Sequence, residues 1–172
     1  TAASALRLGD PLDPETDLGP MVDSKAAART QAWVDEAVAA GAKVLLGGRA
    51  DGTYFPPTIL SDVPIDAKVC SEEAFAPLVV LARFSDFGDA MALANDSRFG
   101  LQAGVFTNDL ANAFRAFDGL EVGGVILNDI PTYRIDHMPY GGVKDSGLGR
   151  EGLRYAIEDM TEIRILVVAQ PG

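Results

Sequence analysis

The stretch PLVVLARFSDFGDAMALANDSRFGLQAGVFTNDLANAFRAFDGLEVGGVILN (residues 77–128) decides the fold class, because strand and helix patterns alternate along it. Residues 77–84 are almost continuously apolar, which predicts a central strand that is covered on both faces. The pattern then indicates a helix over 86–97, a strand over 103–107, a helix over 109–120 and a strand over 123–128. Connections this short between strands leave room only for crossovers. The sequence therefore predicts an α/β fold with a largely parallel sheet and flanking helices.

A loop and a helix are expected near the start of the chain. Residues 9–20 contain three prolines and four acidic residues, a composition typical of a loop. Small and apolar residues then recur with helical spacing over 24–40, namely Ala27, Thr30, Val34, Ala37 and Val38. Asp23 or Ser24 can cap the first exposed amides of this helix, and Gly41 can end it in a left-handed conformation.

Two more strands are expected before residue 77. The pattern predicts them over 42–48 and 54–60. The second contains two prolines, which exclude it from the middle of a sheet and indicate an edge or a bulged strand.

The end of the chain differs in character from the rest. A helix over roughly 150–160 leads to TEIRILVV (161–168), an almost wholly apolar segment with no partner after it in the sequence. An exposed strand of this kind invites pairing with another chain. We therefore expect one domain over residues 1–160 and an oligomerisation strand and tail over 161–172.

The composition narrows the classes of function. The chain has 172 residues, 48% of them hydrophobic, which is enough for a sizeable core. Its formal net charge of −11 would repel a nucleic-acid backbone, and its apolar runs are far shorter than the roughly 20 residues of a membrane helix. The first ten residues lack the basic head and apolar core of a signal peptide. We expect a cytoplasmic protein that binds neither nucleic acid nor membranes.

Cys70 is the only cysteine of the chain, and His137 is the only histidine. A single thiol excludes an internal disulfide, and the sequence holds no Cys/His ligand set for a metal. A Cys70/His137 dyad would need folding to bring the two side chains together with a third, orienting group. Free cysteine is among the most buried residue types, so we interpret Cys70 as a core residue.

A glycine-rich run, MPYGGVKDSGLGREG (138–152), has the composition of a loop that binds phosphate. It does not fit the GxxxxGK[ST] pattern, since Lys144 precedes Asp145, whose carboxylate would repel the ligand. GLGREG (147–152) matches GxGxxG letter for letter, but no buried strand precedes it, as the dinucleotide fingerprint requires. We favour a structural turn; the alternative is a stand-alone nucleotide- or anion-binding module that uses Lys144.

Blocks along the whole chain, in the same order and spacing, resemble the NAD(P)-dependent aldehyde dehydrogenase superfamily. They are GDPLDPETDLGPM (9–21), EEAFAP (72–77), NDSRFGLQAGVFTND (95–109), GGVILNDIPTYRIDHMPYGGVKDSGLGREG (123–152) and TEIRILVV (161–168). The resemblance implies a cysteine thiolate that attacks an aldehyde, an oxyanion hole that stabilises the adduct, and hydride transfer to a nicotinamide. A glutamate then activates the water that hydrolyses the thioester. The resemblance also implies that the glycine-rich run is a structural turn near the substrate mouth and the subunit contact.

The same resemblance places the nucleophile, the general base and most of the NAD or NADP site upstream of residue 9, in an absent N-terminal part. We therefore expect these residues to be the C-terminal portion of the catalytic domain plus the oligomerisation tail, with no catalytic residue and no activity alone. The expected partners are a small aldehyde substrate and, through the terminal strand, further copies in a homo-oligomer. A purely structural oligomerisation piece is a further alternative.

Two residues carry over on the cofactor side. The resemblance assigns Glu73 to hydrogen bonds from the ribose hydroxyls next to the nicotinamide, and Phe75 to placing the nicotinamide ring. The alternative for Glu73 is a solvated surface acid, as for Glu72. Ala76 departs from the glycine that the family usually has there, which bears on the backbone at Phe75.

Residues 128–140 resemble the loop that lines the substrate tunnel. The resemblance places Tyr133 and Arg134 at the distal end of the substrate, and Tyr140 where the family commonly has phenylalanine. The PTYR and PYGGVK blocks are similar to branches that act on lactaldehyde, phosphonoacetaldehyde or phosphorylated glyceraldehyde.

The sequence allows two interpretations of the Arg134 side chain. Its planar fork of donors would suit a carboxylate, phosphate or sulfonate on the substrate. The alternative is an ion pair with Asp129 or Asp136 within the same loop.

Overall fold

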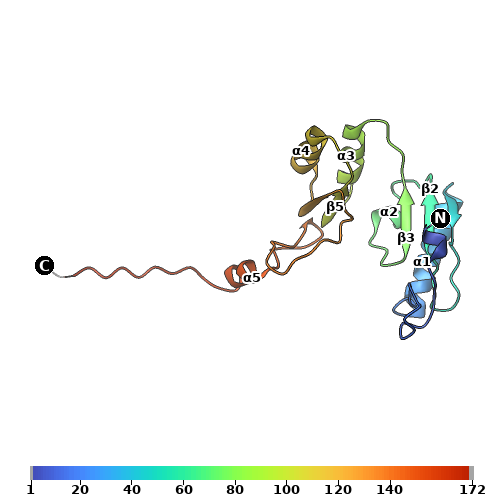
Figure 1. Cartoon of the computed structure of the whole chain (residues 1–172), viewed down its shortest axis with the longest axis horizontal. Helices are drawn as coiled ribbons and strands as arrows, with labels where there is room; N and C mark the ends of the chain where they lie inside the picture. Colours follow the sequence, from blue (N-terminus) through green and yellow to red (C-terminus); the bar gives the residue numbers. More distant parts are fainter. Residues whose placement is uncertain (1, 171–172) are drawn as a thin grey trace. The chain divides into compact units, whose positions relative to one another are not determined.

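A computed structural model of the chain describes residues 2–170, which divide into two compact units (Figure 1). The first unit ends at Arg83 and the second begins at Phe84. Both combine short strands with helices, so the predicted α/β class is confirmed.

The first unit is a small sheet with two helices. Its elements are η1 (Ala2–Ala5), α1 (Ser24–Ala39), β1 (Lys43–Leu46), β2 (Thr58–Ser61), α2 (Lys68–Ser71) and β3 (Leu78–Leu81). The sheet has the order β1-β2-β3, with β1 antiparallel and β3 parallel to β2. The register between β1 and β2 shifts between Val44 and Leu46, as in a β-bulge.

Helix α1 begins and ends as its sequence predicts. The Asp23 side chain accepts a hydrogen bond of 2.7 Å from the Ala26 amide, which satisfies one of the free N–H groups of the first turn. Gly41 takes a φ of +109°, a conformation that glycine adopts without the steric cost of a side chain. Both signals act between near neighbours in sequence, and both appear in the structure.

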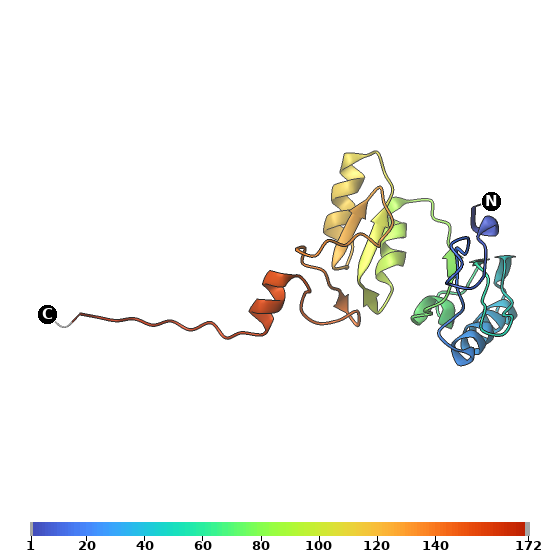
Figure 2. The ribbon, with the colours of Figure 1, turned by 60° about the horizontal axis from the view of Figure 1, so that its bottom comes forward.

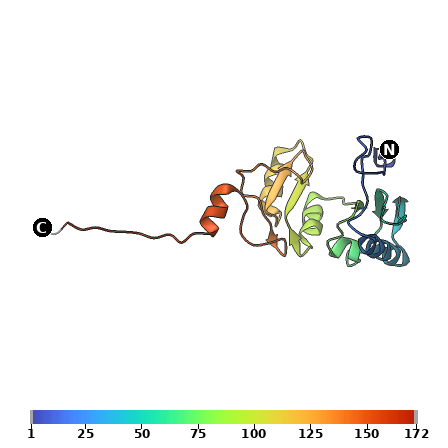
Figure 3. The same cartoon turned by 90° about the horizontal axis from the view of Figure 1, so that it is seen from below.

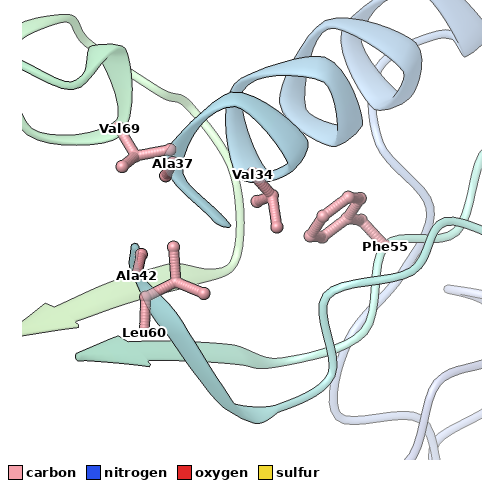
Figure 4. Close-up of a cluster of buried hydrophobic side chains, with 6 residues drawn as sticks. All are labelled: Val34, Ala37, Ala42, Phe55, Leu60 and Val69. Carbon is pink, nitrogen blue, oxygen red and sulfur yellow. The ribbon is translucent and has the colours of Figure 1, made fainter. Parts of the chain in front are cut away.

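The core of the first unit lies between α1 and the sheet (Figure 4). Helix α1 contributes Val34 and Ala37, which meet Leu60 from β2 and Phe55 from the preceding loop. Val34, Phe55 and Leu60 are at most 1% exposed. Burial of a side chain of this size stabilises a fold by about 1.5–3 kcal/mol, so this cluster holds the unit together.

The order of strands in this sheet corrects two expectations. Residues 77–84 were expected to form a central strand, but β3 lies at the edge, and Val79 and Leu81 on it are 56% and 49% exposed. The strand within 54–60 was expected at an edge, but β2 lies in the middle. It can do so because it begins at Thr58, directly after the two prolines, so every residue within β2 keeps its N–H group.

The second unit contains a strand–helix–strand crossover, together with a small antiparallel pair. Its elements are α3 (Phe87–Asn95), β4 (Phe99–Gly100), β5 (Gln102–Val105), α4 (Leu110–Gly119), β6 (Gly124–Leu127), β7 (Val143–Lys144) and α5 (Leu153–Asp159). Strands β5 and β6 run parallel and are joined through α4, as the alternating pattern predicts (Figure 2). Strands β4 and β7 pair antiparallel, so the strand pairings of the chain are mixed.

The last part of the chain leaves α5 in an extended form (Figure 3). The strand expected over 161–168 is not formed within the described residues, since a strand needs a hydrogen-bonded neighbour. Ile163, Ile165 and Leu166 are 100%, 88% and 87% exposed. This segment is therefore apolar and uncovered, as the sequence indicated, but without regular structure of its own.

No helix within residues 2–170 has both the length and the apolar character that crossing a bilayer requires.

Candidate functional site

The five residues predicted for the site fall into two groups. Glu73 and Phe75 belong to the first unit, and Tyr133, Arg134 and Tyr140 belong to the second. Within the second group the structure brings Arg134 and Tyr140 into contact. Glu73 and Phe75 are two residues apart on the segment between α2 and β3.

Glu73 lies on an exposed segment between α2 and β3. Its side chain forms no hydrogen bond or ion pair with another residue of the described range 2–170. A carboxylate in this state can accept hydrogen bonds from two hydroxyl groups at once. Its chemistry therefore fits the ribose of a nicotinamide nucleotide.

Phe75 has an unusual backbone, with a φ of +43°, and its side chain is 78% exposed. A positive φ is rare for an aromatic residue and carries a local strain. The following residues are anchored, because the Pro77 carbonyl accepts a hydrogen bond of 2.8 Å from the Thr58 amide. The positive φ falls on Phe75 and not on Ala76, so the alanine is accommodated without a left-handed backbone.

The loop that carries the other three residues is tied to the end of β5 where it begins. The Asn128 amide donates to the Val105 carbonyl at 2.8 Å, and the Asn128 Oδ1 accepts from the Thr107 amide at 2.9 Å. Farther along, the Tyr133 carbonyl accepts a hydrogen bond of 3.1 Å from the Gln102 side chain. Strand β5 therefore fixes both the start and the middle of this loop.

Arg134 and Tyr140 are in direct contact. The guanidinium carbon of Arg134 lies 5.4 Å from the centre of the Tyr140 ring, which is the geometry of a cation–π contact. Tyr140 in turn pairs with Glu151 through its main chain: its N–H donates to the Glu151 carbonyl at 3.2 Å, and its carbonyl accepts from the Glu151 N–H at 2.6 Å. These contacts join the loop to the far end of the glycine-rich run.

Two carboxylates face the Arg134 guanidinium. Nη2 lies 2.9 Å from Oε2 of Glu151, and Nη1 lies 3.4 Å from Oδ1 of Asp136. The expected ion pair with Asp136 is confirmed, whereas Asp129 accepts a hydrogen bond from the Ile130 amide through its Oδ1. Glu151 was not predicted, because it lies 17 residues away in sequence and no local spacing joins the two.

The glycine-rich run is a structural turn whose Lys144 and Arg150 side chains bind oxygen atoms of the protein. Lys144 Nζ donates to the carbonyls of Asn95 and Ser97 at 2.8 and 3.0 Å and pairs with Glu121 at 2.7 Å. Arg150 Nη1 donates to the carbonyls of Gly142 and Gly149 at 2.9 and 2.7 Å in the same way. With Lys144 held by three oxygens of the protein, the run resembles a cap on α3 more than a cradle for phosphate.

Cys70 was expected to be a core residue, but it is only half-buried at the edge of the core. It lies in α2 and packs, half-buried, against the hydrophobic cluster of the first unit. Burial raises the pKa of its thiol, which disfavours the thiolate that a nucleophile needs. His137 lies in the second unit, and no group of side chains within residues 2–170 could hold a metal ion.

Two apolar hollows also lie on the second unit. One, of about 320 Å³, is lined by residues that include Phe87, Met91 and Val105, and the other, of about 270 Å³, by residues that include Phe114, Phe117 and Leu127. Neither is lined by a charged side chain. They therefore lack the polar side chains that would orient a small polar substrate.

Comparisons with known proteins identify the family of the chain. Residues 1–166 match the aldehyde dehydrogenase family, and the chain belongs to this family.

Among its relatives, the 3-sulfolactaldehyde dehydrogenase of Priestia aryabhattai is 53% identical over 163 residues, which make up 95% of this chain and 34% of that protein. The crystal structure of aldehyde dehydrogenase 21 from Physcomitrella patens, in complex with the reaction product succinate, is 50% identical. It has a TM-score of 0.95 and covers 97% of this chain and 35% of that one. The glyceraldehyde-3-phosphate dehydrogenase of Methanocaldococcus jannaschii DSM 2661, complexed with NADP, is 40% identical with a TM-score of 0.93. The match covers 98% of this chain and 37% of that one. The chain thus spans about a third of the length of the relatives it matches.

Proposed function

We propose that this chain supplies one side of the cofactor site and the distal part of the substrate site of an aldehyde dehydrogenase. The reaction would oxidise an aldehyde to a carboxylic acid through a cysteine thioester. The observation that carries the proposal is the match of 95% of the chain to a relative named as a 3-sulfolactaldehyde dehydrogenase, at 53% identity. Residues 1–160 would belong to the catalytic domain, and residues 161–172 would form an oligomerisation tail.

Glu73 and Phe75 would hold the nicotinamide end of NAD or NADP. The exposed and unpaired carboxylate of Glu73 would accept hydrogen bonds from ribose hydroxyls, and the exposed ring of Phe75 would contact the nicotinamide. When bound, the nucleotide supplies the hydride acceptor. The M. jannaschii relative complexed with NADP supports NAD or NADP as the cofactor.

We propose a small aldehyde with an anionic group as the substrate, held by Arg134 with Tyr133 and Tyr140. Two of the relatives carry such groups in their names, a sulfonate in 3-sulfolactaldehyde and a phosphate in glyceraldehyde 3-phosphate, and a third binds the dicarboxylate succinate. The ion pairs of Arg134 do not oppose this role. Both partner carboxylates are well exposed, and exposed ion pairs contribute only about 0–1 kcal/mol.

We propose further that the nucleophilic thiol lies outside these residues and that the 172-residue chain is inactive alone. The sole cysteine, Cys70, has a raised pKa and packs against the core, which suits a structural thiol. A cytoplasmic location and assembly into a homo-oligomer through residues 161–168 complete the proposal and rest on the sequence.

The test compares two purified proteins, the 172-residue chain and the product of the complete reading frame, in an assay of NAD(P)-dependent oxidation of succinic semialdehyde. We expect turnover by the second protein and none above a blank by the first. Turnover by the 172-residue chain, abolished by Cys70→Ser, would show that the thiol assignment is wrong. No turnover by either protein with any anionic aldehyde would overturn the proposed activity.

A further inference from the structure

Arg134 is held on three sides by groups of the second unit. The Tyr140 ring lies under its guanidinium, Glu151 meets Nη2 at 2.9 Å, and Asp136 meets Nη1 at 3.4 Å. A guanidinium is planar, so one stacked face and one fixed edge leave it little freedom to turn. The remaining edge is the one that faces Asp136.

The two carboxylates differ in how firmly they are placed. Glu151 is joined to Tyr140 by main-chain hydrogen bonds in both directions, at 2.6 and 3.2 Å. Gly152 follows it with a φ of +106°, and a Cβ at that position would meet the Met138 carbonyl. The backbone on both sides of the Glu151 carboxylate is therefore fixed relative to the Tyr140 ring.

Asp136 has no comparable anchor. Its side chain is 100% exposed, and its distance to Nη1 of Arg134 is long for a charge-assisted hydrogen bond, which is ordinarily about 2.7–2.9 Å. An exposed carboxylate at this distance gains little from the contact, so another anion can replace it.

We propose that Glu151 is a positioning residue for Arg134 and that Asp136 occupies the place that a substrate anion takes. Glu151 holds the guanidinium over Tyr140, which leaves Nη1 for a carboxylate, sulfonate or phosphate of the ligand. Asp136 is the carboxylate that this group displaces. The inference rests on the proposed substrate class, and it adds the residues that make Arg134 ready to bind.

The first experiment measures the position of Arg134 without any assay of activity. In the 172-residue chain, the Nε–H signal of Arg134 is assigned by NMR as the one that is lost in Arg134→Lys. We expect Glu151→Gln to shift this signal and to raise the rate at which its proton exchanges with water, because the guanidinium then moves away from the Tyr140 ring. Asp136→Asn and the matched control Glu158→Gln, which removes a carboxylate paired with Arg154 on α5, keep the signal in place. An unchanged signal in Glu151→Gln would overturn the proposal.

The second experiment measures selectivity in the product of the complete reading frame. It compares KM for succinic semialdehyde with KM for butanal, which has the same number of carbons and no charge. We expect Glu151→Gln to raise the ratio of the two KM values about tenfold, and Glu151→Asp to restore part of it. Asp136→Asn lowers the ratio, since the ligand no longer competes with a carboxylate, and Glu158→Gln leaves it unchanged.

The two experiments separate the failure of this inference from the failure of the proposed function. A rise in KM that is equal for both aldehydes would mean that Glu151 serves only the structure of the turn, and the positioning role would be wrong. If neither these two aldehydes nor any other anionic aldehyde is oxidised, the proposed activity fails, and the NMR signal of Arg134 still decides whether Glu151 positions it.

Discussion

Glu73 has the simplest environment of the candidate site residues. Its carboxylate is exposed and has no partner within residues 2–170, so the folded chain gains nothing from its charge. We expect Glu73→Gln to leave the free energy of unfolding unchanged within about 0.5 kcal/mol. In the product of the complete reading frame it raises KM for NAD or NADP about fivefold, because an amide accepts weaker hydrogen bonds from the ribose than a carboxylate does.

The matched control for Glu73 is Asp66→Asn, which removes an exposed acid from the same unit. It should change neither KM nor stability. An unaltered KM in Glu73→Gln would remove Glu73 from the cofactor site.

The next prediction is that the Cys70 thiol reacts slowly with an alkylating reagent. Burial raises the pKa of its thiol in the folded chain, so the thiolate fraction at pH 8 is smaller than in an unfolded peptide. We expect iodoacetamide to alkylate Cys70 several times more slowly than a free cysteine at that pH, and urea to abolish the difference. Alkylation at the rate of the free amino acid would contradict the burial of this thiol.

The same pKa shift sets a sign for stability. The pKa of the Cys70 thiol is higher in the folded chain than in the unfolded chain. The thiol therefore makes its full contribution to the free energy of unfolding at a pH below the unfolded pKa. This contribution is lost as pH rises through the folded pKa.

Arg134 shows which residue contacts could be predicted from the sequence. Its ion pair with Asp136 joins residues two apart in the sequence, and this pair was one of the two interpretations of Arg134 that the sequence allowed. Its contacts with Tyr140 and Glu151 depend on a main-chain bridge between residues 140 and 151, which only the folded turn creates. Contacts of this second kind cannot be predicted from spacing, because the intervening glycines allow many chain paths.

At the scale of elements, Lys144 links the glycine-rich run to the end of α3. Its Nζ donates to two carbonyls at and beyond the C-terminal end of that helix, where a positive charge is favourable. We expect Lys144→Ala to lower the free energy of unfolding by about 1–2 kcal/mol. Lys25→Ala, which removes an exposed lysine from α1, serves as the control and should have little effect.

The same variant tests the alternative function of the run. If the chain were a stand-alone nucleotide-binding module, calorimetry would detect micromolar binding of NAD or ATP that Lys144→Ala abolishes. We expect the 172-residue chain to bind neither nucleotide. Lys144→Ala should then lower the free energy of unfolding without any change in binding.

Some helices and strands could be predicted from the sequence more accurately than others. Helix α1 was predicted almost to the residue, because Asp23 and Gly41 fix its ends through local hydrogen bonds and backbone geometry. The place of β3 in its sheet was not, because an apolar sequence indicates burial without saying which strands provide it. Strand β2 lies in the middle since its prolines end one residue before it begins, a detail that composition alone does not resolve.

At the scale of the whole molecule, the family could be recognised from the order of sequence blocks, and the match over residues 1–166 confirms it. The division into two units at Arg83 could not be predicted from the sequence, because the apolar run through 77–84 gives no sign of a boundary. Burial and exposure at that scale depend on which surfaces meet, which a single sequence does not specify.

The terminal segment leads to the last prediction. Residues 161–168 expose a row of large apolar side chains, with Ile163 and Ile165 at 100% and 88%, and their main-chain groups form no strand within the described chain. An extended apolar segment with free N–H and C=O groups can join the edge of a sheet in another copy. We therefore expect the 172-residue chain to sediment as a dimer or larger species. Ile165→Lys should return it to a monomer, because it places a charge in the paired segment.

Gln170→Lys adds the same charge two residues beyond this segment and is the control. It should leave the sedimentation coefficient as it is, since Gln170 lies outside the apolar row. A chain that is monomeric both before and after Ile165→Lys would contradict pairing through residues 161–168. A chain that associates equally in both cases would place the contact on another surface, such as the exposed aromatic residues Phe114 and Phe117 of α4, at 62% and 69%.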